Sequence, residues 1–223
     1  MKYEIFETRE RVLADNDAQA AKIRTLLNDK AVFFVNLMAS PGAGKTTTLK
    51  GIINELKDRY RIGVIECDID SSVDAQAISE LGIDTIQLHT GTICHMDADM
   101  TLRGLEKFGY EKYDVIFLEN IGNLVCPAEF DIGEHLKMMI LSVPEGDDKP
   151  LKYPLMFTVS DCLLINKIDT KEIFDFNEEA CRERALALNP DIKIFPICAK
   201  DHIGFKPLAD YLIDQIENWR KSL

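Results

Sequence analysis

The residues with the clearest chemistry stand at 39–46, where the sequence reads Ala-Ser-Pro-Gly-Ala-Gly-Lys-Thr. Gly42 and Gly44 allow backbone N–H groups to approach phosphate oxygens, and a helix that begins here adds a partial positive charge. The ammonium group of Lys45 would reach the β- and γ-phosphates, and the hydroxyl of Thr46 would bind Mg²⁺. This spacing predicts a loop that binds a nucleoside triphosphate.

A second candidate nucleotide contact lies at 166–169, where the sequence reads Asn-Lys-Ile-Asp after an apolar run typical of a strand. The carboxylate of Asp169 would accept hydrogen bonds from N1–H and the exocyclic amine of guanine, a pair of donors that adenine lacks. The stem of Lys167 would lie along the base, and Asn166 would tie neighbouring loops together. Alone, such a loop is also an ordinary polar strand end. Together with a phosphate-binding loop, it predicts a guanine nucleotide.

The sequence Cys-Ala-Lys at 198–200 also follows a predicted strand. It resembles the Ser-Ala-Lys loop of GTPases, in which a backbone N–H group contacts the guanine oxygen. The resemblance assigns this contact to Ala199 and Lys200, with a cysteine in the place of serine.

Acidic residues at the ends of two further apolar runs are candidates for the catalytic side of the site. Asp68 and Glu119 each follow a predicted strand, and ligands of open α/β sheets bind at the carboxyl ends of strands. A carboxylate there holds Mg²⁺ or orients the attacking water. We expect Asp68 and Glu119 to bind Mg²⁺ with Thr46, and Asp74 to be a further catalytic candidate. Asp74 is equally well explained as a helix cap.

Two thiols and one imidazole form a candidate metal site. Cys94 and His95 lie between a predicted strand and a predicted helix, and Cys126 lies just after the strand that ends at Glu119. Thiolate and imidazole ligands suit Zn²⁺ in a tetrahedral site or Ni²⁺ in a square-planar one. Taken alone, a Cys-His dipeptide is in most proteins a chance pair with no role in metal binding. Cys67, Cys162 and Cys181 are expected to pack in the core, and the other histidines show no clear partner.

Strand patterns alternate with helix patterns along the chain. Predicted strands lie near 32–38, 61–67, 84–88, 114–119, 137–143, 161–166 and 193–197. Predicted helices lie near 45–57, 73–81, 97–107, 176–188 and 207–221, after an N-terminal helix over 18–27 that is capped by the residues at 15–17. Such alternation predicts an α/β fold with a mainly parallel sheet and helices on both faces. We predict a helical segment at 1–30 packed on a single P-loop NTPase domain at 31–223, with a loop at 143–150.

Composition and charge limit the kinds of partner that the protein is expected to bind. The chain of 223 residues has a formal net charge of −12, and no cluster of lysine and arginine suggests a nucleic-acid partner. No apolar stretch is long enough to cross a membrane, and the first residues do not form a secretory signal. We therefore expect a cytoplasmic protein that binds neither nucleic acid nor membrane.

With these motifs identified, the chain resembles the HypB family of hydrogenase nickel-incorporation GTPases, which belong to the SIMIBI class of P-loop GTPases. The matching segments are 36–47, 94–98, 119–131, 145–148 and 166–169. The resemblance implies that GTP is hydrolysed to GDP and phosphate with Mg²⁺. It adds Ala43 and Thr47 to the nucleotide-binding residues.

The same resemblance implies a role for the metal site. The residues that match Cys94, His95 and Cys126 bind Zn²⁺ or Ni²⁺ in the family, and GTP favours a homodimer with this site at its interface. Nickel would pass through an accessory nickel carrier to the large-subunit precursor of a hydrogenase. Two alternatives stay open, a nucleotide-gated switch with a structural zinc site and a nickel chaperone for another enzyme such as urease.

Overall fold

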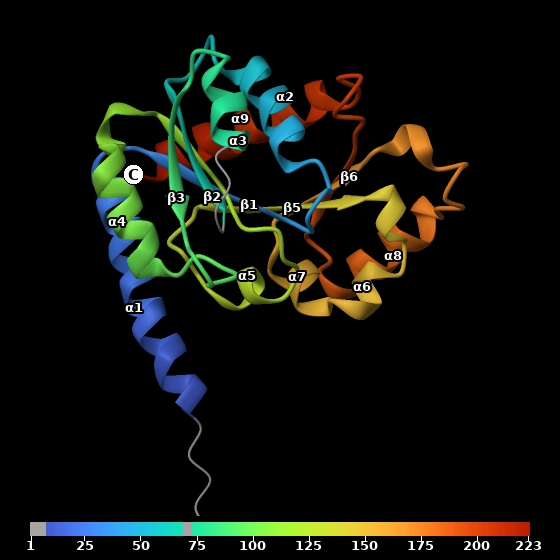
Figure 1. Ribbon diagram of the computed structural model, residues 1–223, viewed down its shortest axis with the longest axis horizontal. Coiled ribbons are helices and arrows are strands. Elements are labelled where there is room, and N and C mark those ends of the chain that lie inside the picture. Colours follow the sequence, from blue (N-terminus) through green and yellow to red (C-terminus); the bar gives the residue numbers. More distant parts are fainter. Residues whose placement is uncertain (1–7, 69–72) are drawn as a thin grey trace, which may run out of the picture.

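A parallel sheet forms the centre of the molecule (Figure 1). The computed structural model of the protein describes residues 8–68 and 73–223, and side chains at 13–68, 75, 76 and 78–223. The seven strands of the sheet are β1 (Phe33–Ala39), β2 (Ile62–Asp68), β3 (Asp84–His89), β4 (Val115–Glu119), β5 (Leu136–Ser142), β6 (Cys162–Asn166) and β7 (Lys193–Pro196). Their order is β3-β2-β4-β1-β5-β6-β7, and every neighbouring pair is parallel. The predicted fold class is thereby confirmed.

Helices cover both faces of this sheet (Figure 1). The longer helices are α1 (Thr8–Asp29), α2 (Lys45–Leu56), α3 (Val73–Ser79), α4 (Ala98–Phe108), α8 (Glu178–Leu188) and α9 (Phe205–Ser222). The short ones are η1 (Tyr110–Lys112), α5 (Cys126–Glu129), η2 (Val143–Glu145), α6 (Lys149–Lys152), α7 (Pro154–Val159) and η3 (Ile168–Thr170). Helices α2, α3 and α9 lie on one face, and α1, α4 and α5 to α8 lie on the other.

The central strands are mostly apolar because both of their faces are covered. In β1, Phe33, Val35 and Leu37 pack under α2 and α9, whereas Phe34 packs towards α1 and α4. Side chains alternate between the faces of a strand, so a strand with two covered faces has no polar side. The exception in β1 is Asn36, which is buried and paired with other polar side chains.

The structure corrects two predictions about helices and adds short helices that were not predicted. α1 spans Thr8–Asp29, so the residues at 15–17 lie inside the helix and do not cap it. The predicted loop at 143–150 contains η2 and the start of α6. The short helices α5 and α7 were not predicted, because their few residues show no helical period and a proline at the first or second position starts each one.

The N-terminal helix is part of the packed structure. Ile23 and Leu27 of α1 are fully buried in a core shared with α4, β1 and β4, while the first turns of α1 extend away from the sheet (Figure 1). The predicted boundary at residue 30 stays a prediction. In the described ranges, no helix is both long and apolar enough to span a bilayer.

His135 is a partly buried histidine with clear partners, contrary to expectation. Its Nδ1 accepts a hydrogen bond from the backbone N–H of Phe34 at 2.9 Å, and its Nε2 lies 3.0 Å from Oδ1 of Asn28. A backbone N–H group only donates, so Nδ1 carries no proton and Nε2–H donates to Asn28. Burial, helped by the charge of Arg24, lowers the pKa of His135 to about 4. The imidazole is therefore neutral in the folded protein.

This histidine predicts a loss of stability in mild acid. The unfolded chain takes up a proton near pH 6.5, whereas folded His135 resists protonation down to about pH 4, so stability falls as the pH falls through this window. We expect the free energy of unfolding in urea to drop by about 2–3 kcal/mol from this group between pH 7 and 4.5. The drop should shrink by this amount in His135→Phe. It should persist in His202→Asn, because His202 is an exposed histidine with a positive φ that asparagine tolerates.

Candidate functional site

The loop between β1 and α2 has a backbone that requires its glycines. Gly42 and Gly44 have φ values of 74° and 96°, in the left-handed region that favours glycine. A Cβ atom on Gly44 would also lie 2.5 Å from Nδ2 of Asn166, so this position needs glycine for space. Ala39 stands where the strict phosphate-loop pattern has glycine, but it ends β1 with ordinary strand geometry. Alanine therefore fits there.

A hollow of about 260 Å³, here called the phosphate hollow, opens at this loop. Its lining residues are Gly42, Gly44, Lys45, Thr46, Thr47 and Glu119. Oγ1 of Thr46 donates a hydrogen bond to Oε1 of Glu119 at 3.0 Å, and Glu119 is 3% exposed. A hydroxyl and a carboxylate oxygen are ligands that Mg²⁺ prefers. These residues fit the cation that accompanies a nucleoside triphosphate.

Of the other two predicted carboxylates, the structure places one, Asp68, at the same edge of the sheet. Asp68 ends β2, and Glu66 of that strand pairs in register with Glu119 of β4. Because side chains alternate along a strand, Asp68 and Glu66 face the same side of the sheet as Glu119. Asp68 is not among the residues that line the phosphate hollow. Asp74 belongs to α3, but its side chain lies outside the described part of the chain.

The loop after β6 is tied to the phosphate-binding loop. Nδ2 of Asn166 donates to the carbonyl of Ala43 at 2.9 Å, and its Oδ1 accepts from the backbone N–H groups of Lys167 and Ala199. Nζ of Lys167 donates to the carbonyl of Gly42 at 2.8 Å. These contacts join three loops that are far apart in the sequence. Asn166 thus lies where the sequence predicts a residue that ties loops together.

A second hollow of about 180 Å³, here called the base hollow, lies at these loops. Its lining residues are Gly44, Thr47, Asn166, Lys167, Asp169, Thr170, Cys198, Ala199 and Lys200. It shares Gly44 and Thr47 with the phosphate hollow. The two hollows therefore form one elongated cradle, with the groups suited to binding phosphates at one end and the aspartate at the other.

Cys198 contacts the aspartate of the base hollow. Its Sγ lies 3.2 Å from Oδ1 of Asp169 and is 1% exposed. Burial is the main cause that raises the pKa of this thiol, so the thiol keeps its proton and donates to the carboxylate. The contact orients Asp169. Nothing in the sequence around Cys198 beyond the likeness to a Ser-Ala-Lys loop signals it.

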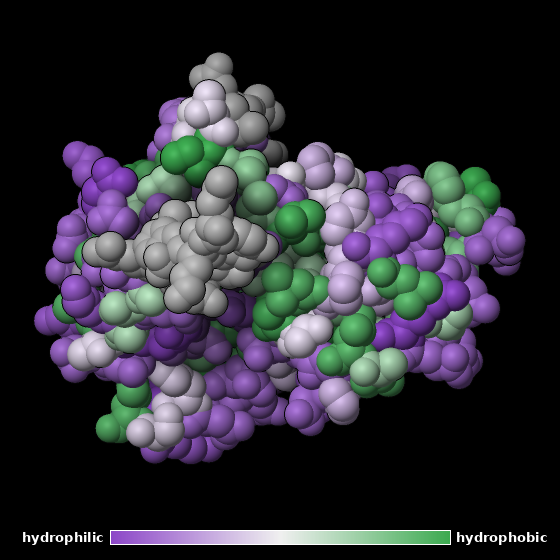
Figure 2. Space-filling model, turned by 90° about the horizontal axis from the view of Figure 1, so that it is seen from below, coloured by the Kyte–Doolittle hydropathy of each residue, from purple (hydrophilic) through white to green (hydrophobic). Residues whose placement is uncertain are grey.

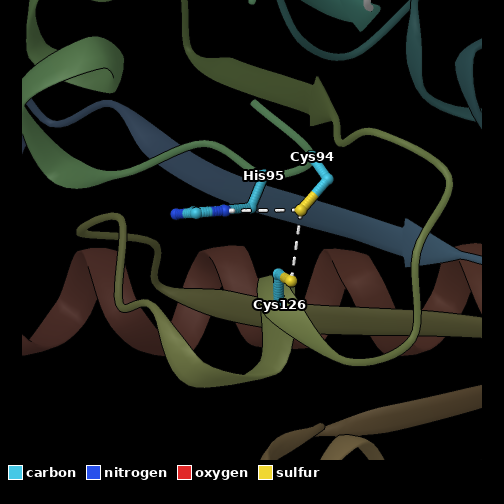
Figure 3. Close-up of side chains that lie close together, drawn as sticks. All are labelled: Cys94, His95 and Cys126. Atoms are coloured by element: carbon cyan, nitrogen blue, oxygen red, sulfur yellow. Dashed lines mark hydrogen bonds between the residues drawn. The ribbon is translucent and has the colours of Figure 1, made fainter. Parts of the chain in front are cut away.

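Cys94, His95 and Cys126 come together although Cys94 and His95 lie on one loop and Cys126 lies at the start of α5 (Figure 3). Sγ of Cys94 lies 3.2 Å from Sγ of Cys126 and 3.9 Å from Nδ1 of His95. The three ligand atoms lie within 4.8 Å of one another, which is close enough for one metal ion to contact all of them. Cys94 and His95 precede α4, and Cys126 is the first residue of α5.

The protonation of this cluster depends on its surroundings. Burial lowers the pKa of His95, and its ring stacks on Phe130 with centroids 4.0 Å apart, so the imidazole is in the neutral form that binds metals. The hydrogen bond with Cys94 is the main cause that raises the pKa of Cys126. Both thiols must lose protons to bind a metal, so metal uptake releases protons and strengthens as the pH rises. Nothing in the sequence indicates that Phe130 stacks on His95.

The segment between β4 and α5 touches both the phosphate-binding loop and the metal cluster. A Cβ atom on Gly122 would lie 2.9 Å from Pro41, so the two backbones are in close contact. The N–H group of Asn123 donates to the carbonyl of Ala39 at 2.9 Å, and its side chain donates to the carbonyl of Cys94 at 3.3 Å. This segment is a direct physical connection between the two candidate sites.

Exposed apolar side chains lie beside two of the metal ligands in the sequence and on α7. Figure 2 shows such side chains on the face below the sheet, where α5, α6 and α7 lie. Ile93 is 42% exposed, Val125 is 49% exposed and Leu155 is 45% exposed. Ile93 and Val125 are each next in sequence to a candidate metal ligand. Exposed apolar groups in such a position are typical of a surface that contacts another protein.

Comparisons with known proteins agree with this geometry. The nucleotide-binding domain of the CobW/HypB/UreG family matches residues 33–196. The chain is 43% identical over 208 residues to the hydrogenase maturation factor HypB of Rhizobium leguminosarum, covering 93% of this chain and 70% of that protein. It is 35% identical over 218 residues to the hydrogenase/urease maturation factor HypB of Helicobacter pylori, covering 96% and 89%.

A solved structure is also similar. The crystal structure of Helicobacter pylori HypB in complex with nickel superimposes with a TM-score of 0.85 at 36% identity, covering 92% of this chain and 97% of that one. Some curated relatives are longer, since the chain spans 63% of the length of HypB from Azotobacter chroococcum.

Proposed function

This chain belongs to the CobW/HypB/UreG family of nucleotide-binding proteins and, within it, to the HypB maturation factors, and from that premise we propose that it is a GTP-hydrolysing metallochaperone. Its cargo is nickel, delivered to the precursor of a nickel–iron hydrogenase. The observation that carries the proposal is the meeting of Cys94, His95 and Cys126 beside a segment that also touches the phosphate-binding loop.

The nucleotide half of the mechanism uses the continuous cradle. Asp169 selects guanine at the base hollow, while Lys45 and the backbone N–H groups of the glycine-rich loop hold the phosphates. Thr46 and Glu119, with Asp68 at the neighbouring strand end, would hold Mg²⁺, which supplies positive charge to the phosphates. A carboxylate at this edge orients the water that releases phosphate and leaves GDP.

The metal half of the mechanism follows from the connecting segment. Glu119 lies at the phosphate hollow and Cys126 lies at the metal cluster, with Gly122 and Asn123 between them packed against the start of the phosphate-binding loop. A change of this loop between the GTP and GDP states would move Cys126 relative to Cys94 and so change nickel affinity. Hydrolysis would thereby be coupled to nickel release.

Partners follow from the exposed apolar side chains beside the metal ligands and on α7. The apolar side chains of Ile93, Val125 and Leu155 suit a second copy of the chain in a GTP-dependent homodimer, with the metal site at the interface. An accessory nickel carrier and the hydrogenase large-subunit precursor are the proposed partners in transfer. Delivery to urease is a second candidate, because the Helicobacter pylori relative is named for both enzymes.

We expect nickel binding to depend on the bound nucleotide. Equilibrium dialysis of Ni²⁺ against the protein with a non-hydrolysable GTP analogue, and separately with GDP, should give affinities that differ by about 5–150-fold. Cys126→Ala should weaken binding by more than about 100-fold in both states. Cys181→Ala is the matched control, since Cys181 is a fully buried thiol of α8 that is not part of the cluster.

Three outcomes discriminate among the candidates. A nickel affinity that is the same with the GTP analogue and with GDP would contradict the coupling between hydrolysis and nickel release. Zinc that resists chelators and leaves GTP turnover unchanged would favour a nucleotide-gated switch with a structural zinc site. Nickel transfer to a urease precursor and not to a hydrogenase precursor would favour the second candidate.

A further inference from the structure

Asn16 lies in the middle of α1 and bridges the two loops that carry the candidate metal ligands. Its Oδ1 accepts a hydrogen bond from the backbone N–H of Ala98 at 2.9 Å, and its Nδ2 donates to the carbonyl of Asp131 at 2.7 Å. Asn16 is 9% exposed. Loss of either contact would leave a buried polar group without its partner, which is costly. A single side chain thus fixes two loops that are distant in the sequence.

Both contacts of Asn16 lie next to His95 and its stacking partner. Ala98 is the first residue of α4 and closely follows His95. Asp131 directly follows Phe130, whose ring stacks on His95. The amide bridge and the stacked rings therefore join the same two loops at adjacent points. If the bridge were lost, the loops would separate where His95 is held.

α1 provides a firm base for the bridge. Ile23 and Leu27 anchor the helix in the core beneath α4. Arg24 donates from Nη2 to both carboxylate oxygens of Asp131, at 2.5 and 2.7 Å. The loop that contains Asp131 is therefore held by α1 twice, through its backbone carbonyl by Asn16 and through its side chain by Arg24.

We propose that Asn16 is a positioning residue of the metal site, which holds His95 in place relative to the thiols of Cys94 and Cys126. The inference rests on the proposed function, since it takes these three residues as nickel ligands. Groups that orient metal ligands without touching the metal change affinity by about 10–100-fold. Asn16 lies outside the matched region at 33–196. The metal site accordingly depends on a helix beyond the nucleotide-binding domain.

The test compares nickel affinity among variants of the full chain, by competition with a chromophoric chelator. Asn16→Ala should bind Ni²⁺ about 10–100-fold more weakly, with the affinity for a GTP analogue unchanged. Asn16→Asp has the same shape and keeps the acceptor for Ala98 but loses the donor for Asp131. It should also weaken binding, and it decides the question if the alanine variant does not fold. Gln19→Ala is the control, because Gln19 lies one turn away on α1 and, among the described residues, its side chain accepts a hydrogen bond only from Lys22.

A double mutant separates positioning from a general loss of stability. If Asn16 acts by holding His95, then Asn16→Ala combined with His95→Ala should bind nickel no more weakly than His95→Ala alone. Wild-type affinity in the Asn16 variants, or losses that simply multiply in the double mutant, would overturn the inference while the proposed function stands. If the unmodified chain takes up no nickel, or Cys126→Ala takes it up normally, the proposed function and the inference both fail.

Discussion

Lys45→Ala is expected to lower GTP turnover by at least about 100-fold, the loss typical when one group that stabilises transition-state charge is removed. Lys45 is the first residue of α2 and lines the phosphate hollow beside Thr46. Negative charge spreads over the phosphate oxygens as the terminal phosphoryl group departs, and an ammonium group fixed at that position stabilises it. Release of inorganic phosphate at saturating GTP and Mg²⁺ measures the effect.

The matched control for this lysine lies directly after the same helix. Lys57→Ala removes an ammonium group at the other end of α2, where Nζ of Lys57 donates to Oδ1 of Asn54. Turnover of this variant should stay within about twofold of the unmodified protein, because surface changes away from the site have small effects. Undiminished turnover in Lys45→Ala, with nucleotide still bound, would mean that the phosphate hollow is not where hydrolysis takes place.

Asp169→Asn should change the preferred base from guanine to xanthine. The carboxylate of Asp169 lines the base hollow and accepts two donors of guanine in the proposed complex. Xanthine has a carbonyl oxygen where guanine has its exocyclic amine, so it requires the donor that an asparagine amide supplies. The amide oxygen of asparagine still accepts from N1–H, so one hydrogen bond is lost, and because a hydrogen bond to a charged group contributes about 1.5–3 kcal/mol, GTP binding should weaken by about 10–10²-fold.

Competition of GTP, XTP and ATP for a fluorescent nucleotide measures this change of preference. The control is Asp201→Asn, since Asp201 also lies near Sγ of Cys198, at 3.3 Å, but does not line the base hollow. Its preference for GTP should persist. A variant Asp169→Asn that still prefers GTP over XTP would place the base elsewhere.

The sheet could be predicted from the sequence because its strands carry their own signal. An apolar run of five to seven residues such as β1 (Phe33–Ala39) is buried on both faces and ends at a glycine-rich loop or an acidic residue. The start of α1 could not be predicted, because a stretch of polar residues inside a helix resembles a cap. Asp15 and Asp17 lie within α1, and only the contacts of Asn16 with distant loops explain the polar residue between them.

The candidate ligands were visible in the sequence, but the residues that hold them were not. Cys94, His95 and Cys126 have side chains that commonly bind metals, so they could be selected by residue type. The roles of Phe130 and Asn16 depend instead on contacts across the fold. The contact between Cys198 and Asp169 is of the same kind. Residue types identify the groups that can do chemistry. The residues that hold those groups in place are identified by tertiary contacts, which the periodicity and spacing of a sequence do not show.

The position of β1 in the sheet also determines when the protein can fold during its synthesis. β1 is the first strand made, yet its neighbours are β4 and β5, which end at Glu119 and Ser142. A ribosome that adds about 5–20 residues per second needs roughly 5–20 s to reach the end of β5 after it completes β1. Until then, β1 is an apolar strand that lacks both of its neighbouring strands, and the glycine-rich loop after it lacks the sheet that would hold it in place. Nascent chains of this protein should therefore be exposed to aggregation until the fifth strand emerges, and nucleotide binding should begin late in synthesis.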